Sequence, residues 1–213
     1  MARNIQNIND LLRFIIRKER GVFVTYAEAD TALEAAQLDA FNEYFKAYAV
    51  NQVIHDALMP FKVYQSFTSS SVGVVTYPSD YLHLLAGVFT LTGSSTCPVR
   101  FVQTDEWPDA ISSQLRPVSI TAPIATDTST GFQLYPKVEH TGAYNYLRRP
   151  ATPVYAYTQV GRVITYNAAG STQLEWGDLY IDNIIAKALK YFGINMGEDG
   201  ISQFAQILDK ETQ

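Results

Sequence analysis

The feature that most constrains the fold is a change in hydrophobic period along the chain. Near both ends, apolar residues recur at spacings of three and four, a pattern that predicts amphipathic helices. From about Ser66 they alternate with polar residues, which predicts strands. These periods predict an α+β fold. Residues 1–65 and 176–213 form a discontinuous helical bundle, and residues 66–175 form an inserted antiparallel β domain.

The first predicted helix begins at Asn9 or Asp10, either of which can cap it. Its apolar residues share one face, and Gly21 is a natural end. The residues of that face are Leu11, Leu12, Ile15 and Ile16.

The second predicted helix starts with a capping box formed by Thr25 and Glu28. A regular apolar stripe follows the capping box and continues, with a small shift in phase, to Pro60, which ends the helical segment. The pattern leaves open whether this segment is one long helix or two helices with a kink near Ala49.

Short strand-like runs fill the middle of the chain, separated by clusters of Gly, Pro, Ser and Thr. One short helix is predicted within them at 105–113, and a small-residue turn at 167–171. The runs are LAGVFTLT, VRFVQ, VSITA, FQLYP, AYNYLRR, VYAYTQ, RVITYN and TQLEW.

The chain returns to a helical pattern near its end. Asp178 caps a segment that Gly193 closes, and a last short helix follows Gly200. The apolar face of the longer helix consists of Ile181, Ile184, Ile185, Ala188, Leu189 and Phe192, and that of the shorter one of Ile201, Phe204, Ala205 and Leu208.

Composition excludes several classes of protein. The net charge of −5 and a pI near 5.2 argue against a dedicated nucleic-acid-binding protein, whose surface is normally basic. The single cysteine, Cys97, rules out an internal disulfide framework. No run approaches 18 apolar residues, and the first residues lack the apolar core of a signal peptide, so we expect no membrane contact and assembly in the cytoplasm. The 14 tyrosines fit a protein with extensive interfaces.

Catalytic and metal-binding patterns are absent from the sequence, so we expect no catalytic residue, cofactor or metal ligand. The three histidines, His55, His83 and His140, are not at metal-ligand spacing. Carboxylates near Trp107 and Trp176 have the residue types of a glycosidase acid pair. Helix starts account for these carboxylates more simply, because the helix dipole favours negative charge there.

Five segments of the chain recur together in one family of proteins. The five segments are, in order, YPSDYLHL, VRFVQTDEW, FQLYP, YNYLRRP and LEWGDLYIDNIIAKALKYFG. They resemble the head–tail adaptor proteins of short-tailed phages, which form connector rings and are also called tail tubular protein A-like. The first half of the chain, with YAEADTALEAAQLDAFNEYFKAY, is similar to ring proteins of crAss-like phages.

The resemblance implies a non-enzymatic virion protein at the head–tail junction. Such adaptors form a ring, commonly of twelve subunits, below the portal protein. The ring extends the DNA channel, lets double-stranded DNA pass without sequence-specific contacts, and offers a platform for the tail or other neck rings.

The segment 132–150 is the predicted subunit interface. We expect FQLYP and YNYLRRP to form one hairpin that packs on the next subunit, with aromatic area and arginines that bind carboxylates. Its proposed contact residues are Tyr135, Tyr144, Tyr146, Arg148 and Arg149. The family carries one arginine two residues before the proline, so either Arg148 or Arg149 can take the structural role.

The resemblance also implies that the C-terminal helix contacts the portal, with Phe204, Ile207 and Leu208 as the docking residues. An equally open interpretation is that Phe204 and Leu208 complete the helical bundle. Two alternative functions remain at this stage. One is another neck ring or a fibre-attachment virion protein, and the other is a carbohydrate-binding module with tryptophans in its site.

Overall fold

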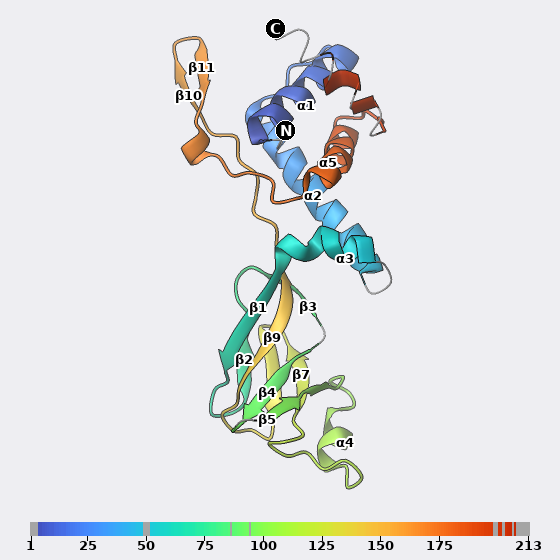
Figure 1. Ribbon diagram of the computed structural model, residues 1–213, viewed down its shortest axis with the longest axis vertical. Coiled ribbons are helices and arrows are strands. Elements are labelled where there is room, and N and C mark those ends of the chain that lie inside the picture. The colour runs from blue at the N-terminus through green and yellow to red at the C-terminus, as the bar shows by residue number, and fades with distance from the viewer. Residues whose placement is uncertain are drawn as a thin grey trace. The chain divides into compact units, whose positions relative to one another are not determined.

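The computed structural model describes residues 4–48, 52–85, 87–93, 95–197, 200–201, 203–205 and 207. The protein has an α+β fold, with antiparallel and mixed sheets, that divides into two compact units. The helical unit comprises residues 1–60 and 150–213, and the β unit comprises residues 61–149 (Figure 1). The β unit is therefore an insertion within the sequence of the helical unit.

Helix α1 (Ile5–Arg20) begins five or six residues earlier than the sequence indicated, depending on whether Asn9 or Asp10 is taken as the predicted cap. Its cap is Asn4, whose side-chain oxygen accepts a hydrogen bond from the backbone N–H of Asn7 at 2.8 Å. The predicted cap Asn9 is instead buried, and its amide donates to Asp30 at 3.1 Å. The predicted end is confirmed, because Gly21 adopts a left-handed conformation with φ 67° and its N–H binds the Arg17 carbonyl.

Helix α2 (Tyr26–Ala47) starts with the predicted capping box of Thr25 and Glu28. Helix α3 (Gln52–Leu58) follows, and the short 3-10 helix η1 (Met59–Phe61) contains Pro60. The described chain therefore shows two helices, one on each side of residues 49–51, which lie outside the described ranges.

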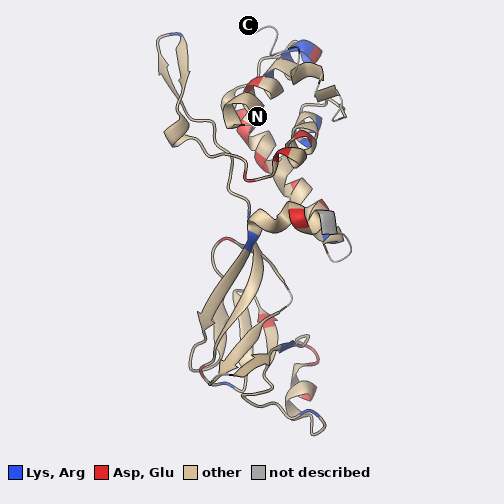
Figure 2. Cartoon of the chain, in the orientation of Figure 1, with Lys and Arg blue, Asp and Glu red and all other residues tan. Residues whose placement is uncertain are grey.

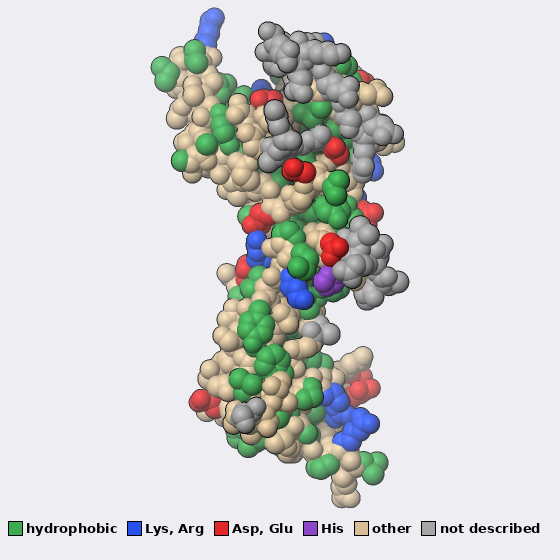
Figure 3. Space-filling view, viewed as in Figure 1, with side chains coloured by type: hydrophobic (Ala, Val, Ile, Leu, Met, Phe, Trp, Pro, Cys, Tyr) green, Lys and Arg blue, Asp and Glu red, His purple; other side chains and the backbone are tan. Residues whose placement is uncertain are grey.

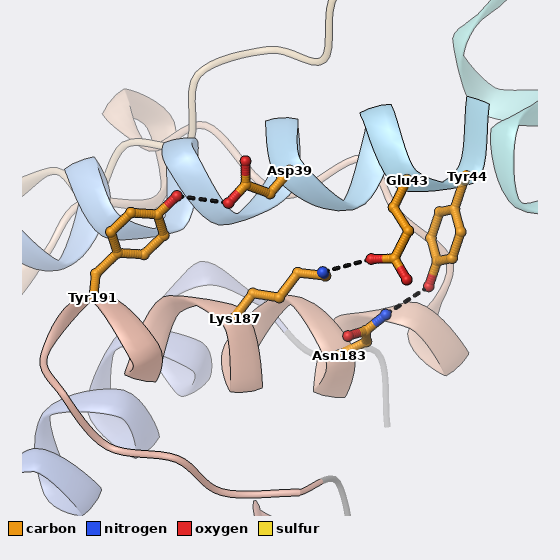
Figure 4. Close-up of polar contacts among 6 residues, drawn as sticks. All are labelled: Asp39, Glu43, Tyr44, Asn183, Lys187 and Tyr191. Atoms are coloured by element: carbon orange, nitrogen blue, oxygen red, sulfur yellow. Dashed lines mark hydrogen bonds and ion pairs between the residues drawn. The ribbon is translucent and has the colours of Figure 1, made fainter. Parts of the chain in front are cut away.

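Helix α5 (Asp178–Tyr191) packs against α2 and forms the core of the helical unit. Its predicted apolar face is confirmed at Ile181, Ile184, Ile185, Ala188 and Leu189, all buried, whereas Phe192 is half-buried. Three polar contacts also join the two helices (Figure 4): Tyr191 donates to Asp39 at 2.7 Å, Lys187 pairs with Glu43 at 2.6 Å, and Asn183 donates to Tyr44 at 2.8 Å. Gly193 follows the helix with φ 73°, as expected for a C-terminal glycine.

The β unit contains two sheets. The first has the order β1 (Lys62–Thr68), β9 (Thr141–Arg148), β4 (Phe89–Thr92) and β5 (Ser95–Pro98), and β3 (Tyr81–Leu84) also pairs with β9. The second has the order β2 (Val74–Thr76), β8 (Gly131–Tyr135), β7 (Ile124–Thr128) and β6 (Arg100–Phe101). All described pairings are antiparallel except β6 with β7, so the second sheet is mixed.

An aromatic cluster forms the core of the β unit. Tyr144 and Phe132 meet edge to face with ring centroids 5.7 Å apart, and Phe67 contacts both rings. The other buried members are Val75, Val88, Ala125, Leu134 and Tyr146. Because β8 and β9 belong to different sheets, their facing side chains meet in this core.

The predicted hairpin of 132–150 is therefore wrong. Strand β8 pairs with β2 and β7, while β9 pairs with β1, β3 and β4. Aromatic residues in both strands made them resemble partners. The pairing is long-range instead, since β1 lies about 80 residues before β9.

The division between the units also differs from the predicted boundaries of 66 and 175. Strand β1 begins at Lys62, and residues 61–65 belong to the β unit. Residues 150–175 belong to the helical unit, because their polar groups form hydrogen bonds with its helices. The Gln37 amide donates to the Ala151 carbonyl at 2.9 Å, and the Ile5 N–H donates to Gln173 at 2.6 Å.

The remaining predicted elements are partly confirmed. The helix expected at 105–113 is confirmed as α4 (Trp107–Ser112). The runs VSITA and TQLEW form only isolated bridges, Ser119 with Ala122 and Val154 with Thr172. Gly177 rather than Asp178 precedes α5. None of the helices in the described part of the chain is both long and apolar enough to cross a membrane.

Candidate assembly surface

A two-stranded hairpin in the helical unit is exposed along almost its whole length. Strand β10 (Tyr157–Val160) pairs with β11 (Val163–Tyr166), with Val160 opposite Val163 and Tyr157 opposite Tyr166. Gly161 has φ 62°, which the tight turn between the strands requires. We call residues 157–166 the arm (Figure 1). In the described structure neither of its strands pairs with a further strand.

Both faces of the arm are open and nearly uncharged. Nine of its ten residues are exposed, with Val160 at 80% and Val163 at 67%. Its one charged residue is Arg162, in the turn (Figure 2). Hydrophobic side chains line its length (Figure 3). Natural proteins protect exposed edges with charged residues, proline or bulges, and the arm has none of these within its strands. An isolated two-stranded hairpin is also only marginally stable in water.

The base of the arm is fixed to the start of α2 by stacked tyrosines. The rings of Tyr26 and Tyr155 lie 4.2 Å apart and nearly parallel, at 8°, and Tyr157 also contacts Tyr26. Arg13 places its guanidinium 3.9 Å from the centre of the Tyr26 ring, on which it can form a cation–π contact. Burial, followed by the proximity of Tyr26 and Asp10, raises the pKa of Tyr155 to about 12.

A polar pair, buried Asn9 and half-buried Asp30, supports the same base. The Asp30 carboxylate accepts hydrogen bonds from the Tyr155 N–H at 2.8 Å and from the Asn9 amide at 3.1 Å. Burial raises the pKa of Asp30, and these two hydrogen bonds lower it in part. The contacts of Tyr155 therefore fix the base of the arm, whereas residues 158–165 beyond it are exposed.

Strand β1 provides a second unpaired edge. It hydrogen-bonds with β9 along seven residues, and no other described strand pairs with it. It contains no proline, and its one charged residue is Lys62 at its start. Tyr64 is 63% exposed. The other outer strands of the two sheets offer less. Strands β2 and β6 have three and two residues, β3 has four with an irregular register, and β5 ends at Pro98, which has no N–H.

Two of the predicted interface residues lie inside the β unit. Tyr144 is 1% and Tyr146 is 3% exposed, so neither side chain can reach another subunit. Tyr146 donates instead to Asp80 at 3.0 Å. Tyr135 is half-buried and meets Trp107 edge to face with centroids 6.1 Å apart. Their burial contradicts the predicted interface role of Tyr144 and Tyr146. The sequence was misleading because a tyrosine-rich strand is as suitable for a core as for an interface.

The two adjacent arginines differ in position. Arg148 is half-buried at the end of β9, with its guanidinium 5.7 Å from the centre of the Phe61 ring. Arg149 is exposed, and its backbone N–H binds the Asp80 carbonyl at 2.7 Å. Arg148 thus has a contact expected of a structural residue.

The predicted portal-docking residues have different surroundings. The Phe204 ring is half-buried and meets Phe14 of α1 edge to face at 6.1 Å, as expected of a residue that completes the bundle. Ile207 is 44% exposed and remains available. Leu208 lies outside the described residues.

No group of three His, Cys, Asp or Glu among the described residues could hold a metal ion. His140 is buried and bonds the Pro136 carbonyl at 2.9 Å through its ring. Trp176 is 4% exposed and packs on Phe41 and Tyr44, so it lines no site.

An open groove of about 580 Å³ lies beside Tyr77 and Tyr81 in the β unit. The two rings stack on each other at 3.7 Å, and the Tyr77 hydroxyl donates to Asp127 at 3.2 Å. Burial is the largest cause of a raised pKa for Tyr77. The groove's aromatic faces and carboxylate are thus already partnered within the protein, and it offers no clear ligand chemistry.

The sequence predicted a small-residue turn at 167–171, whereas the turn between β10 and β11 lies at Gly161 and Arg162. Residues 168–170 form a 3-10 helix, η2 (Ala168–Gly170), at the base. The signal was present in the sequence, since Gly161-Arg162 separates two runs rich in Thr, Tyr and Val by two residues, which is typical of a tight hairpin.

Comparison of the chain with protein-family models and with curated proteins found no match.

Proposed function

We propose that this chain is a non-enzymatic virion protein that forms an adaptor ring at the head–tail junction of a short-tailed phage. The ring lies below the portal protein, extends the DNA channel and provides a docking platform for the tail or for other neck rings. The choice of this assembly rests on the five sequence segments that resemble head–tail adaptors and occur in the same order.

The observation that carries the proposal is the exposed arm. Exposed apolar strands without protective charges are a liability for a monomer and an asset for a subunit whose neighbours cover them. A ring needs a heterologous interface, in which two different surfaces of each subunit meet. The arm and the unpaired edge of β1 are two such surfaces on one chain.

The distribution of charge is compatible with a DNA channel. The helical unit holds ten Lys and Arg against fifteen Asp and Glu, and the β unit holds six of each. A protein that bound DNA through phosphate contacts would present a basic surface. We therefore expect DNA to pass such a ring without being held by it. A direct check is that the purified protein shows no retention of duplex DNA at 50 mM salt.

The test of the proposal is the mass of the purified protein by native mass spectrometry, combined with negative-stain imaging. Both measurements are made with the protein alone and mixed with the portal protein of the same phage. Rings, commonly of twelve subunits in this family, or a complex that forms only with the portal, support the proposal. A monomer that ignores the portal at high micromolar concentration contradicts it.

Portal docking by the C-terminal segment has its own comparison. Ile207→Asp adds a charge to an exposed apolar side chain and is expected to weaken portal binding without changing the fold. Leu115→Asp is the matched control, because Leu115 is 96% exposed in the β unit. Equal portal affinity of the two variants would place docking elsewhere.

A carbohydrate-binding module gains no support from the tryptophans. Trp176 is buried between α2 and α5, and Trp107 contacts Tyr135. A sugar platform requires an exposed aromatic face, which Trp176 does not offer.

A further inference from the structure

We infer that the arm of one copy adds to the unpaired edge of β1 in the next copy, and so extends the sheet β1-β9-β4-β5 across the subunit boundary. This inference rests on the proposed ring function, because a ring requires each subunit to give one surface and receive another. The occupant of both surfaces is a second copy of this chain.

The first argument concerns hydrogen bonding. A strand edge presents backbone N–H and C=O groups that another strand can bind, and such strand addition is a common mode of recognition. Strand β1 has seven residues, no proline and one charge, and Tyr64 on it is 63% exposed. Each strand of the arm has four residues, which matches a little over half the length of β1.

The second argument concerns the direction of the added strand. The described pairings of the β1 sheet are all antiparallel, and antiparallel pairs are slightly more stable per residue. The strand of the arm that pairs with β1 is either β10 or β11. If β11 runs antiparallel to β1, the turn with Arg162 lies near Thr68, and Tyr166 lies toward Tyr64. If β10 did so, the turn would lie near Lys62.

The third argument is charge, which chooses between these two directions. The Lys62 end of β1 also carries Arg148 and Arg149, because Lys62 is paired with Leu147 of β9. The Thr68 end is paired with Thr141, which follows the loop containing Lys137 and Glu139. Arg162 has the exposed carboxylate of Glu139 available at the Thr68 end, which favours the direction that places the turn there. Strand β11 is therefore the strand that pairs with β1.

Photo-crosslinking tests the contact itself. The aromatic photo-crosslinker p-benzoylphenylalanine replaces Tyr64, which is exposed, so the fold is retained. The protein is prepared as the full chain with two different tags, and the two preparations are mixed with and without the portal protein. The expected result is a covalent adduct between differently tagged copies, with peptides of the arm, residues 157–166, identified at the junction.

A charge exchange tests the direction. Arg162→Glu and Glu139→Lys are each expected to reduce this adduct about fivefold, since a like-charge contact replaces an attraction. The double variant is expected to restore the adduct to within about twofold of the original, which a general loss of stability would not do. Arg116→Glu is the control, because Arg116 is exposed in the β unit and belongs to neither surface. Unchanged circular dichroism of the variants confirms that they fold.

The outcomes separate the inference from the proposed function. Rings whose Tyr64 adducts contain no arm peptide, and which tolerate both charge changes, overturn the inference and leave the ring function intact. Adducts of position 64 with the portal in place of the arm also overturn it. In a third outcome the protein forms no ring, with or without the portal, yet the adduct between copies forms and the double charge variant restores it. That result supports the inference and contradicts the ring function.

Discussion

The ring of Tyr155 stacks on the ring of Tyr26 with centroids 4.2 Å apart and planes 8° apart, so the chain leading into the arm is fixed to the start of α2. Tyr155 is 6% exposed, whereas Val160, five residues later, is 80% exposed. This contrast separates a base that belongs to the fold of one subunit from an arm that is available to another.

Replacing Tyr26 with alanine is expected to loosen the arm. The change removes the stacked ring and the surface on which Arg13 rests, at a cost of about 1–2 kcal/mol in the free energy of unfolding. Amide hydrogen exchange over residues 155–166 should quicken, while exchange in α5 stays within a few-fold of the original. Tyr26→Phe keeps the ring and serves as the control. Equal exchange in the two variants would mean that stacking does not fix the base.

The contact between α2 and α5 should depend on apolar packing more than on its ion pair. Ile184 is fully buried, so Ile184→Ala is expected to cost about 2–5 kcal/mol. The Lys187–Glu43 pair is partly solvated, with the Glu43 side chain 62% exposed, so Lys187→Ala is expected to cost at most about 1 kcal/mol. Urea unfolding of both variants measures the difference. A larger loss for Lys187→Ala would contradict this order.

Gly142 in β9 should not tolerate a side chain. A Cβ at this position would meet the Phe89 carbonyl oxygen and the Phe67 ring, and backbone atoms of a paired strand cannot move aside cheaply. Gly142→Ala is expected to cost at least about 1–3 kcal/mol through overpacking. Gly197→Ala is the matched control, since nothing lies within 4 Å of its Cβ position. Thermal unfolding that is equal for the two variants would disprove the close approach.

Stability should fall at alkaline pH because of Tyr146. Burial, together with the hydrogen bond that its hydroxyl donates to Asp80, raises the pKa of Tyr146 to about 12, against about 10 in an unfolded chain. The folded state thus holds its proton more tightly, and this contribution is complete below pH 10 and is lost as the pH rises toward 12. Urea unfolding at pH 8, 10 and 11 measures the decline.

Tyr146→Phe removes the ionisable hydroxyl and is the control for that decline. The variant is less stable at pH 8 because it lacks the bond to Asp80, yet its stability should fall less between pH 10 and pH 11. Tyr155, whose pKa is also raised to about 12, accounts for part of the decline in stability that remains in this variant. A decline of the same size in Tyr146→Phe would assign the effect to other groups.

The helical elements were largely predictable because their signals are local. The Thr25–Glu28 capping box, the ends at Gly21 and Gly193 and the apolar face of α5 each depend on residues within one or two turns. The cap of α1 was missed because Asn9 and Asn4 are equally suitable by type. Only the burial of Asn9 beside Asp30 distinguishes them.

The candidate surface was less predictable because exposure is a tertiary property. The predicted hairpin had the aromatic composition of an interface, but Tyr144 and Tyr146 fill the core between two sheets. Conversely, the arm contains ordinary strand residues. It is distinctive only because nothing in the described part of the same chain covers it.

By itself the sequence determined the fold class, the main helices and most strand segments, because backbone propensity and hydrophobic period act over a few neighbouring residues. The tertiary structure alone decided which strands pair, that residues 150–175 belong with the helices, and which tyrosines are buried. These outcomes depend on contacts between residues far apart in the chain, such as Tyr146 with Val63 or Asp30 with Tyr155, whose partners no local pattern identifies.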